Sequence, residues 1–149
     1  MNVNEVKAKL ELIGLKGKFQ TTGHADYARI YVLDAHGVTL GRISMFQGAY
    51  SHIKWYSGII EAYNIDQRRP TLAWDMMLQT GQVLTDELWS SIKIQAQEMQ
   101  LDATRQLQQW RLDNPPKLDH NGNPKRRRSI KGPSIMKCIR LIMNLSGGY

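Results

Sequence analysis

Residues 27–46 read YARIYVLDAHGVTLGRISMF, and this stretch decides the fold. Its first part is rich in β-branched and aromatic residues, which favour strands. Residues 34–37, Asp-Ala-His-Gly, have the composition of a tight turn. Alternate side chains of the part after the turn share a face, which groups Val38, Leu40, Arg42, Ser44 and Phe46 on one side and Thr39, Gly41, Ile43 and Met45 on the other. The stretch predicts an antiparallel β-hairpin.

The flanking residues extend this prediction. Before the hairpin, residues 4–13 carry Val6, Leu10 and Ile13 at helical spacing behind Asn4, a residue that caps helices well. The polar residues 20–26 then predict a loop. After the hairpin, residues 53–56 suit a third strand.

Three further helices follow in the sequence. Pro70 suits the start of a short helix over residues 71–79, because proline is favoured at the first helical position. Thr85 is the expected cap of a long helix over residues 86–112. The apolar residues of that helix recur every three or four positions and predict one long buried seam: Trp89, Ile92, Ala96, Met99, Ala103, Leu107 and Trp110. A last helix is expected over residues 134–144.

The predicted fold class is therefore α+β. An N-terminal helix and a hairpin or small three-stranded sheet pack on the long helix, and a basic arm and a short terminal helix follow. We predict a neutral core domain over residues 1–114, a flexible basic arm over 115–132 and a short apolar helical segment over 133–149.

The positive charge is unevenly distributed along the chain. Residues 1–114 contain 12 Lys and Arg and 12 Asp and Glu, whereas residues 115–149 contain eight Lys and Arg and a single acid, Asp119. The whole net charge of +7 thus comes from the C-terminal part. Such a split is typical of an arm that docks on a polyanion.

Residues 125–131, KRRRSIK, place five cations within seven positions. Arginine forks match phosphate oxygens, and cations that meet a polynucleotide release its counterions. The segment predicts a phosphate grip that does not depend on sequence. The alternative is a solvated basic loop. The candidate phosphate-binding residues are Lys117, Lys125, Arg126, Arg127, Arg128, Lys131, Lys137 and Arg140.

Aromatic residues also lie close to cations in residues 42–56. Trp55 and Tyr56 follow Lys54 directly, and Arg42 belongs to the hairpin. Exposed aromatic rings beside cations can stack single-stranded bases. We therefore add Arg42, Lys54, Trp55 and Tyr56 to the candidate nucleic-acid-binding residues. The alternative is that Trp55 and Tyr56 pack in the core or on an edge strand.

Enzyme signatures are weak, so the sequence favours a non-enzymatic role without cofactor or metal. The four histidines show no zinc spacing, and Cys138 is a lone thiol in an apolar run, which favours packing. Residues 118–124, LDHNGNP, resemble the core motif of the HNH homing endonucleases, in which a histidine is the general base and a ββα fold holds a metal. Here the spacer after His120 is missing and two prolines, Pro115 and Pro116, stand where a strand belongs. We assign His120 no catalytic role.

These observations support three hypotheses. The first is a non-enzymatic protein that binds DNA or RNA through its basic arm. The second is a small phage or mobile-element protein, of the anti-CRISPR or anti-restriction kind, that binds a host protein or ribonucleoprotein through the helix over residues 86–112. The third is a metal-dependent nuclease built from scattered carboxylates. No apolar run is long enough to span a membrane, so we expect a cytoplasmic protein, and a homodimer is left open.

Overall fold

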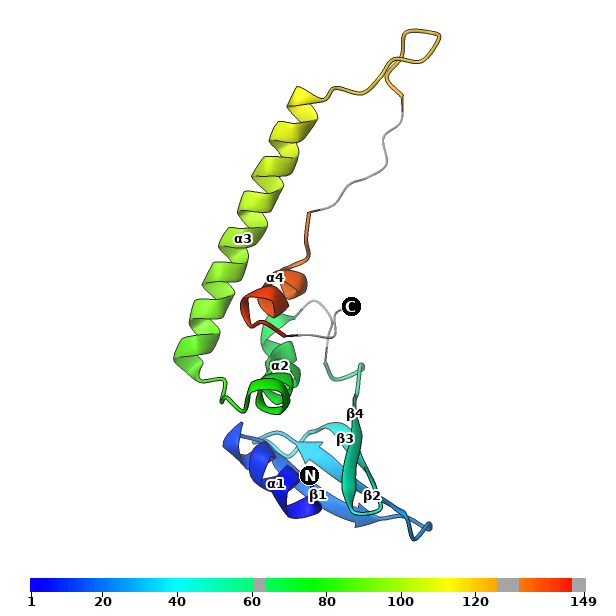
Figure 1. Cartoon of the computed structure of the whole chain (residues 1–149), viewed down its shortest axis with the longest axis vertical. Helices are drawn as coiled ribbons and strands as arrows, with labels where there is room; N and C mark the ends of the chain where they lie inside the picture. The colour runs from blue at the N-terminus through cyan, green and yellow to red at the C-terminus, as the bar shows by residue number, and fades with distance from the viewer. Residues whose placement is uncertain (61–63, 126–131, 146–149) are drawn as a thin grey trace. The chain divides into compact units, whose positions relative to one another are not determined.

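The computed structural model describes residues 1–60, 64–125 and 132–145, and it confirms the α+β class. The chain divides into two compact units, Met1–Leu84 and Thr85–Tyr149. In the described residues the first unit contains the helices α1 (Val3–Leu12) and α2 (Ile65–Thr80) and the sheet, and the second contains α3 (Asp86–Asp113) and α4 (Ile135–Ile142) (Figure 1). None of these helices is long and apolar enough to cross a membrane.

The sheet is an antiparallel meander in the order β1 (Lys16–Thr21), β2 (Tyr27–Leu33), β3 (Thr39–Phe46) and β4 (Ala49–Trp55). The predicted hairpin is confirmed as β2 and β3, in which Ile30 lies opposite Ile43. Its turn is closed by Asp34, whose carboxylate accepts hydrogen bonds from the amides of His36 (2.8 Å) and Val38 (2.9 Å). The predicted third strand is confirmed as part of β4.

One strand was not expected from the sequence. Residues 16–21 form the edge strand β1, which pairs with β2 from Lys16 opposite Leu33 to Thr21 opposite Ala28. The predicted loop over residues 20–26 therefore begins too early, because Gln20 and Thr21 belong to β1. The segment contains few strand formers, and its extended conformation comes from pairing with β2.

Helix α1 covers one face of the sheet (Figure 1). Asn2, rather than the expected Asn4, caps it by accepting a hydrogen bond from the Glu5 amide at 2.8 Å. A Cβ built on Gly17 would lie 2.9 Å from Ile30 and 3.1 Å from Leu10, so helix and sheet are in close contact here. The core of this unit is formed by Val6, Leu10, Leu15, Ile30, Val32, Leu40, Ile43, Met45, Ile60 and Trp74.

Helix α2 begins six residues earlier than its predicted start at Thr71. Asn64 caps it by accepting a hydrogen bond from the Gln67 amide at 3.1 Å, and Pro70 lies inside the helix rather than at its first position. In the helix interior Pro70 removes the hydrogen bond to the Asp66 carbonyl, and its ring crowds that carbonyl. Burial of the apolar residues that follow, Leu72, Ala73, Trp74, Met76 and Met77, offsets this cost.

In the second unit α3 and α4 pack against each other. The predicted cap is confirmed, because the Thr85 hydroxyl accepts a hydrogen bond from the Leu88 amide at 3.2 Å. The prediction of a seam buried along the whole helix is wrong for its second half. Trp89, Ile92 and Ala96 are buried, whereas Trp110 is 49% exposed.

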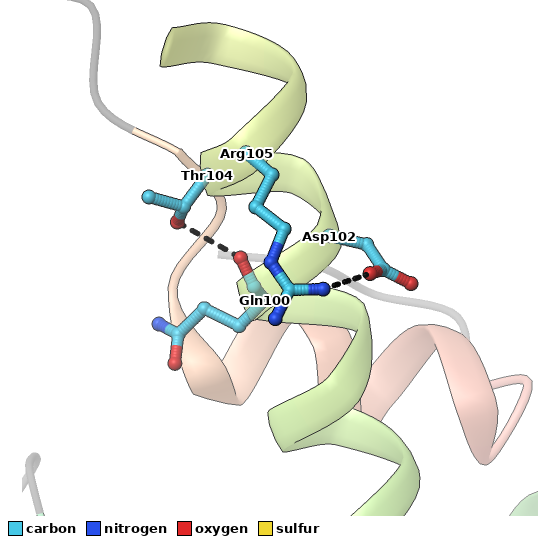
Figure 2. Close-up of polar contacts among 4 residues, drawn as sticks. All are labelled: Gln100, Asp102, Thr104 and Arg105. Carbon is cyan, nitrogen blue, oxygen red and sulfur yellow. Dashed lines mark hydrogen bonds and ion pairs between the residues drawn. The ribbon is translucent and has the colours of Figure 1, made fainter. Parts of the chain in front are cut away.

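Two polar contacts in the middle of α3 lie within the helix (Figure 2), and a third joins the Gln100 side-chain amide to the Pro133 carbonyl at 3.3 Å. The Thr104 hydroxyl donates to the Gln100 carbonyl at 2.9 Å, and Arg105 lies 3.6 Å from Asp102. Both charged side chains are well exposed, so the ion pair adds little stability.

Candidate nucleic-acid interface

The sheet face opposite α1 carries the candidate site, and we call it the open face. Because side chains alternate along a strand, the burial of Ile30, Val32 and Ile43 beneath α1 places their neighbours on the other side. None of the side chains on the open face is buried, and they are Lys16, Lys18, Gln20, Tyr27, Arg29, Tyr31, Leu33, Arg42, Ser44, Phe46, His52 and Lys54.

Strand register aligns these residues in rows across the sheet. Lys18 lies opposite Tyr31, Tyr31 opposite Arg42, and Arg42 opposite Lys54. This row, which we call the central row, therefore places three cations and one aromatic ring on four adjacent strands. With strands about 4.8 Å apart it spans roughly 14 Å. The neighbouring row contains Gln20, Arg29, Ser44 and His52.

The Asp and Glu residues of the chain are absent from the four strands, so the open face carries only positive charge. Strand residues 16–21, 27–33, 39–46 and 49–55 contain five Lys and Arg and no Asp or Glu. All five cations lie on the open face, and within the described part of the chain none of their side chains forms a hydrogen bond or an ion pair. Like charges this close repel one another unless a counter-charge binds, so the face is suited to an anion with several charges.

Aromatic rings lie among these cations. Tyr27 is 52% exposed, and its ring lies 5.1 Å from that of Phe46 and 6.0 Å from that of His24. Tyr31 is half-buried between Lys18 and Arg42. A shallow hollow of about 450 Å³ adjoins it, lined by Gln20, Thr21, Thr22, Gly23, His24, Arg29 and Tyr31.

Of the four candidates predicted near the hairpin, two belong to the open face. Arg42 and Lys54 are cross-strand neighbours in the central row. Trp55, one residue further along β4, lies on the opposite side and packs against the core. Tyr56 follows the strand, is half-buried, and donates its amide hydrogen to the Leu40 carbonyl at 2.9 Å.

The first part of the predicted arm, residues 117–125, forms a hydrogen-bonded loop. The Lys125 amide donates to the Lys117 carbonyl at 2.8 Å, and Leu118 pairs with Pro124 as an isolated antiparallel bridge. The Asp119 carboxylate accepts hydrogen bonds from the amides of Asn121 and Asn123, each at 2.9 Å. Residues 117–125 are thus a tight turn with Lys117 and Lys125 at its base. Arg126, Arg127, Arg128 and Lys131 lie outside the described residues.

The two candidate cations on α4 differ in exposure. Lys137 is exposed, whereas Arg140 is only 8% exposed. Cys138 between them is a buried free thiol, and burial raises its pKa. This environment agrees with the expected packing role, because a thiol with a raised pKa is a poor nucleophile at neutral pH.

Metal-ligating side chains are scattered in the described residues. No group of three or more His, Cys, Asp or Glu gathers there as a metal site would require. The stretch that resembles the HNH motif forms the turn around Asp119, with His120 exposed. Its Asp carboxylate is already used by two backbone amides.

Sequence reasoning missed several residues of the candidate interface, among them Lys16, Lys18, Arg29 and Tyr31. The two lysines alternate with Gly17 and Phe19, which is a strand pattern, but the polar residues that follow favour a loop. Arg29 and Tyr31 lie on the same face of β2, but only the register between β2 and β3 shows that this is also the face of Arg42.

Comparison with protein-family models, with curated protein sequences and with solved structures yields no match for this chain.

Proposed function

We propose that this protein binds nucleic acid without cleaving it, by holding phosphates on the open face and on the basic segment of residues 117–131. The observation that carries the proposal is the central row, in which Lys18, Arg42 and Lys54 align across four strands with no acid beside them. The paired strands hold the backbone of these residues in place, so only side-chain conformational entropy is lost when phosphates bind.

The basic segment supports the same function by its charge. Lys117 and Lys125 are exposed at the base of the Asp119 turn, and four more cations follow within the next six residues. Contacts to phosphates position a protein on nucleic acid but carry no sequence information. We therefore expect affinity from both groups of cations and little preference for sequence from either.

The test is fluorescence anisotropy of labelled DNA and RNA with the full chain at about 50 mM and 200 mM salt. The variant Lys18→Gln/Lys54→Gln removes two exposed cations from the outer strands of the open face. The control Lys9→Gln/Arg105→Gln removes two cations from α1 and α3 and gives the same net charge. Substitution is preferable to truncation after Asn114, because truncation would separate α3 from α4.

For a single strand each phosphate contact adds about 0.7 to the slope of log affinity against log salt. The open-face variant should therefore lower the slope by about 1.4 and weaken binding at 50 mM salt by about 50-fold. The control should bind as the wild type does. Equal weakening by both variants would show that net charge alone drives binding, and the proposal for the open face would fail.

The same assay separates the contribution of the arm. Replacing Lys125, Arg126, Arg127, Arg128 and Lys131 with glutamine should lower the slope by about 3.5 if all five contact phosphates. An unchanged slope would show that these five residues do not contact phosphates.

A second candidate function is binding to a protein partner through α3. The observation that favours it is the exposed apolar surface in the second half of the helix, where Leu101, Trp110 and Leu112 are 56%, 49% and 76% exposed. Aromatic residues such as Trp110 are frequent anchors of protein interfaces. A partner or a second copy bound there would remain bound at high salt, and Trp110→Ala would release it.

A further inference from the structure

We infer that the ligand of the open face is a single-stranded polynucleotide whose bases stack on Tyr31 and on the Tyr27–Phe46 pair. This inference rests on the proposed function and specifies its ligand. It is based on where the aromatic rings lie relative to the cations.

The rings and cations alternate in two directions. Across the sheet Tyr31 lies between Lys18 and Arg42. Along β2 the order on the open face is Tyr27, Arg29, Tyr31, with about 6.7 Å between successive members. The two ring positions are therefore about 13 Å apart, with a guanidinium group between them. A strand that follows β2 would meet ring, cation and ring in turn.

The surface beside Tyr31 is hollowed, so a flat group can reach the ring. The hollow of about 450 Å³ is lined by Tyr31 and by polar groups of Gln20, Arg29 and residues 21–24. A base seated there would find a ring to stack on and donors and acceptors for its edge. Stacking of this kind tolerates any base, because every base has a π-face.

A single strand fits this arrangement better than a duplex does. In a duplex the bases are stacked on one another, so side-chain rings cannot reach their faces, and only the phosphates would meet the open face. Tyr27 and Phe46 would then remain as exposed apolar surface in the complex. With a single strand the exposed rings and the unpaired cations are both used.

The test compares four labelled probes of about 12 nucleotides, which is within the usual site size of such surfaces. They are oligo-dT, oligo-rU, an abasic strand with the same phosphates and a DNA duplex. The protein is the full chain as wild type, Tyr31→Phe and Tyr31→Leu. The control is Phe19→Leu, because Phe19 is 41% exposed on the neighbouring strand but lies on the face towards α1.

The wild type should bind at least one of the two single strands about 5- to 100-fold more tightly than the abasic strand. The tighter of the two would identify DNA or RNA as the ligand. Tyr31→Leu should lose part of that preference, because the Tyr27–Phe46 pair remains, while Tyr31→Phe and Phe19→Leu should keep all of it. Circular dichroism of each variant verifies the fold, and the comparison of probes on the wild type does not depend on any variant.

Two failures are distinguishable. If no probe binds in a salt-dependent way, the proposed function is wrong. If the abasic strand and the duplex bind as tightly as the single strands, phosphates are held but bases are not stacked, and the inference is overturned. Unchanged preference in a folded Tyr31→Leu variant would overturn it as well.

Discussion

The close approach of β3 and β4 at Gly41 makes the register of the open face testable. A Cβ built on Gly41 would lie 2.5 Å from the Lys54 carbonyl oxygen and 3.1 Å from the Trp55 Cα. Both atoms belong to the backbone of β4, so no side chain can move aside. Gly41→Ala must therefore push β4 away from β3, next to the position where Arg42 and Lys54 are aligned.

The size of the effect follows from these contacts. Ordinary carbon–oxygen contacts are about 3.3 Å or more, so β4 would have to move by about 0.8 Å. Overpacking of a well-packed region costs about 1–3 kcal/mol, and backbone that cannot adjust favours the upper end. We expect Gly41→Ala to lower the free energy of unfolding by about 3 kcal/mol and the urea midpoint by about 1 M or more.

The assay is urea denaturation followed by circular dichroism, with Gly58→Ala as the matched control. A Cβ on Gly58 would meet nothing within 4 Å, so this change should alter stability by less than about 1 kcal/mol. If Gly41→Ala were as stable as Gly58→Ala, β3 and β4 could not pair as described. The alignment of Arg42 with Lys54 would then be refuted.

Three other residues give further predictions. Burial raises the pKa of Tyr50, with the Trp74 side chain offsetting part of the rise and the charge of Asp75 adding to it. Folding therefore favours the neutral phenol, so stability present below about pH 10 should fall as the pH rises further. The wild type should lose more stability between about pH 9 and pH 11 than Tyr50→Phe does, and an equal loss in urea titrations would contradict this. Cys138 should react slowly with a thiol reagent at about pH 8 in the native protein and rapidly in urea, because burial shields it and raises its pKa; rapid native labelling would show that the packing of α4 against α3 does not bury it. Thr85→Ala should destabilise α3 by about 1 kcal/mol through loss of the cap, while Thr85→Ser should change little, and equal urea midpoints for the two variants would argue against the cap.

Periodicity predicted the elements whose pattern is local. The hairpin around Asp34 and the helix capped by Thr85 each combine a clear period with capping or turn residues, and both are confirmed. The strand β1 lacked such a signal, because only Phe19 and Thr21 among its residues favour strands. Its structure depends on pairing with β2, which is a long-range interaction that no local pattern reveals.

The candidate site shows why charge totals are a poor guide to surfaces. Residues 1–114 carry no net charge, so the charge count alone points to the basic segment that follows them. The sheet separates the signs in space, with five cations on one face and no acid in any strand residue of 16–21, 27–33, 39–46 and 49–55. Sequence parity relates Arg29 to Tyr31 and Arg42 to Ser44, but only the register between strands shows that both pairs lie on the same face.

Nuclear magnetic resonance titration of the full chain with a single-stranded oligonucleotide of about 12 nucleotides tests the central claim most directly, because it locates the contact. If the open face binds the oligonucleotide, the largest amide shift changes should fall on Lys18, Arg29, Tyr31, Arg42 and Lys54, and residues of α1 should change little. Shift changes confined to the second unit, residues 85–149, would contradict the claim that the open face binds nucleic acid. A titration at low salt that shifts no amide signal would contradict it as well.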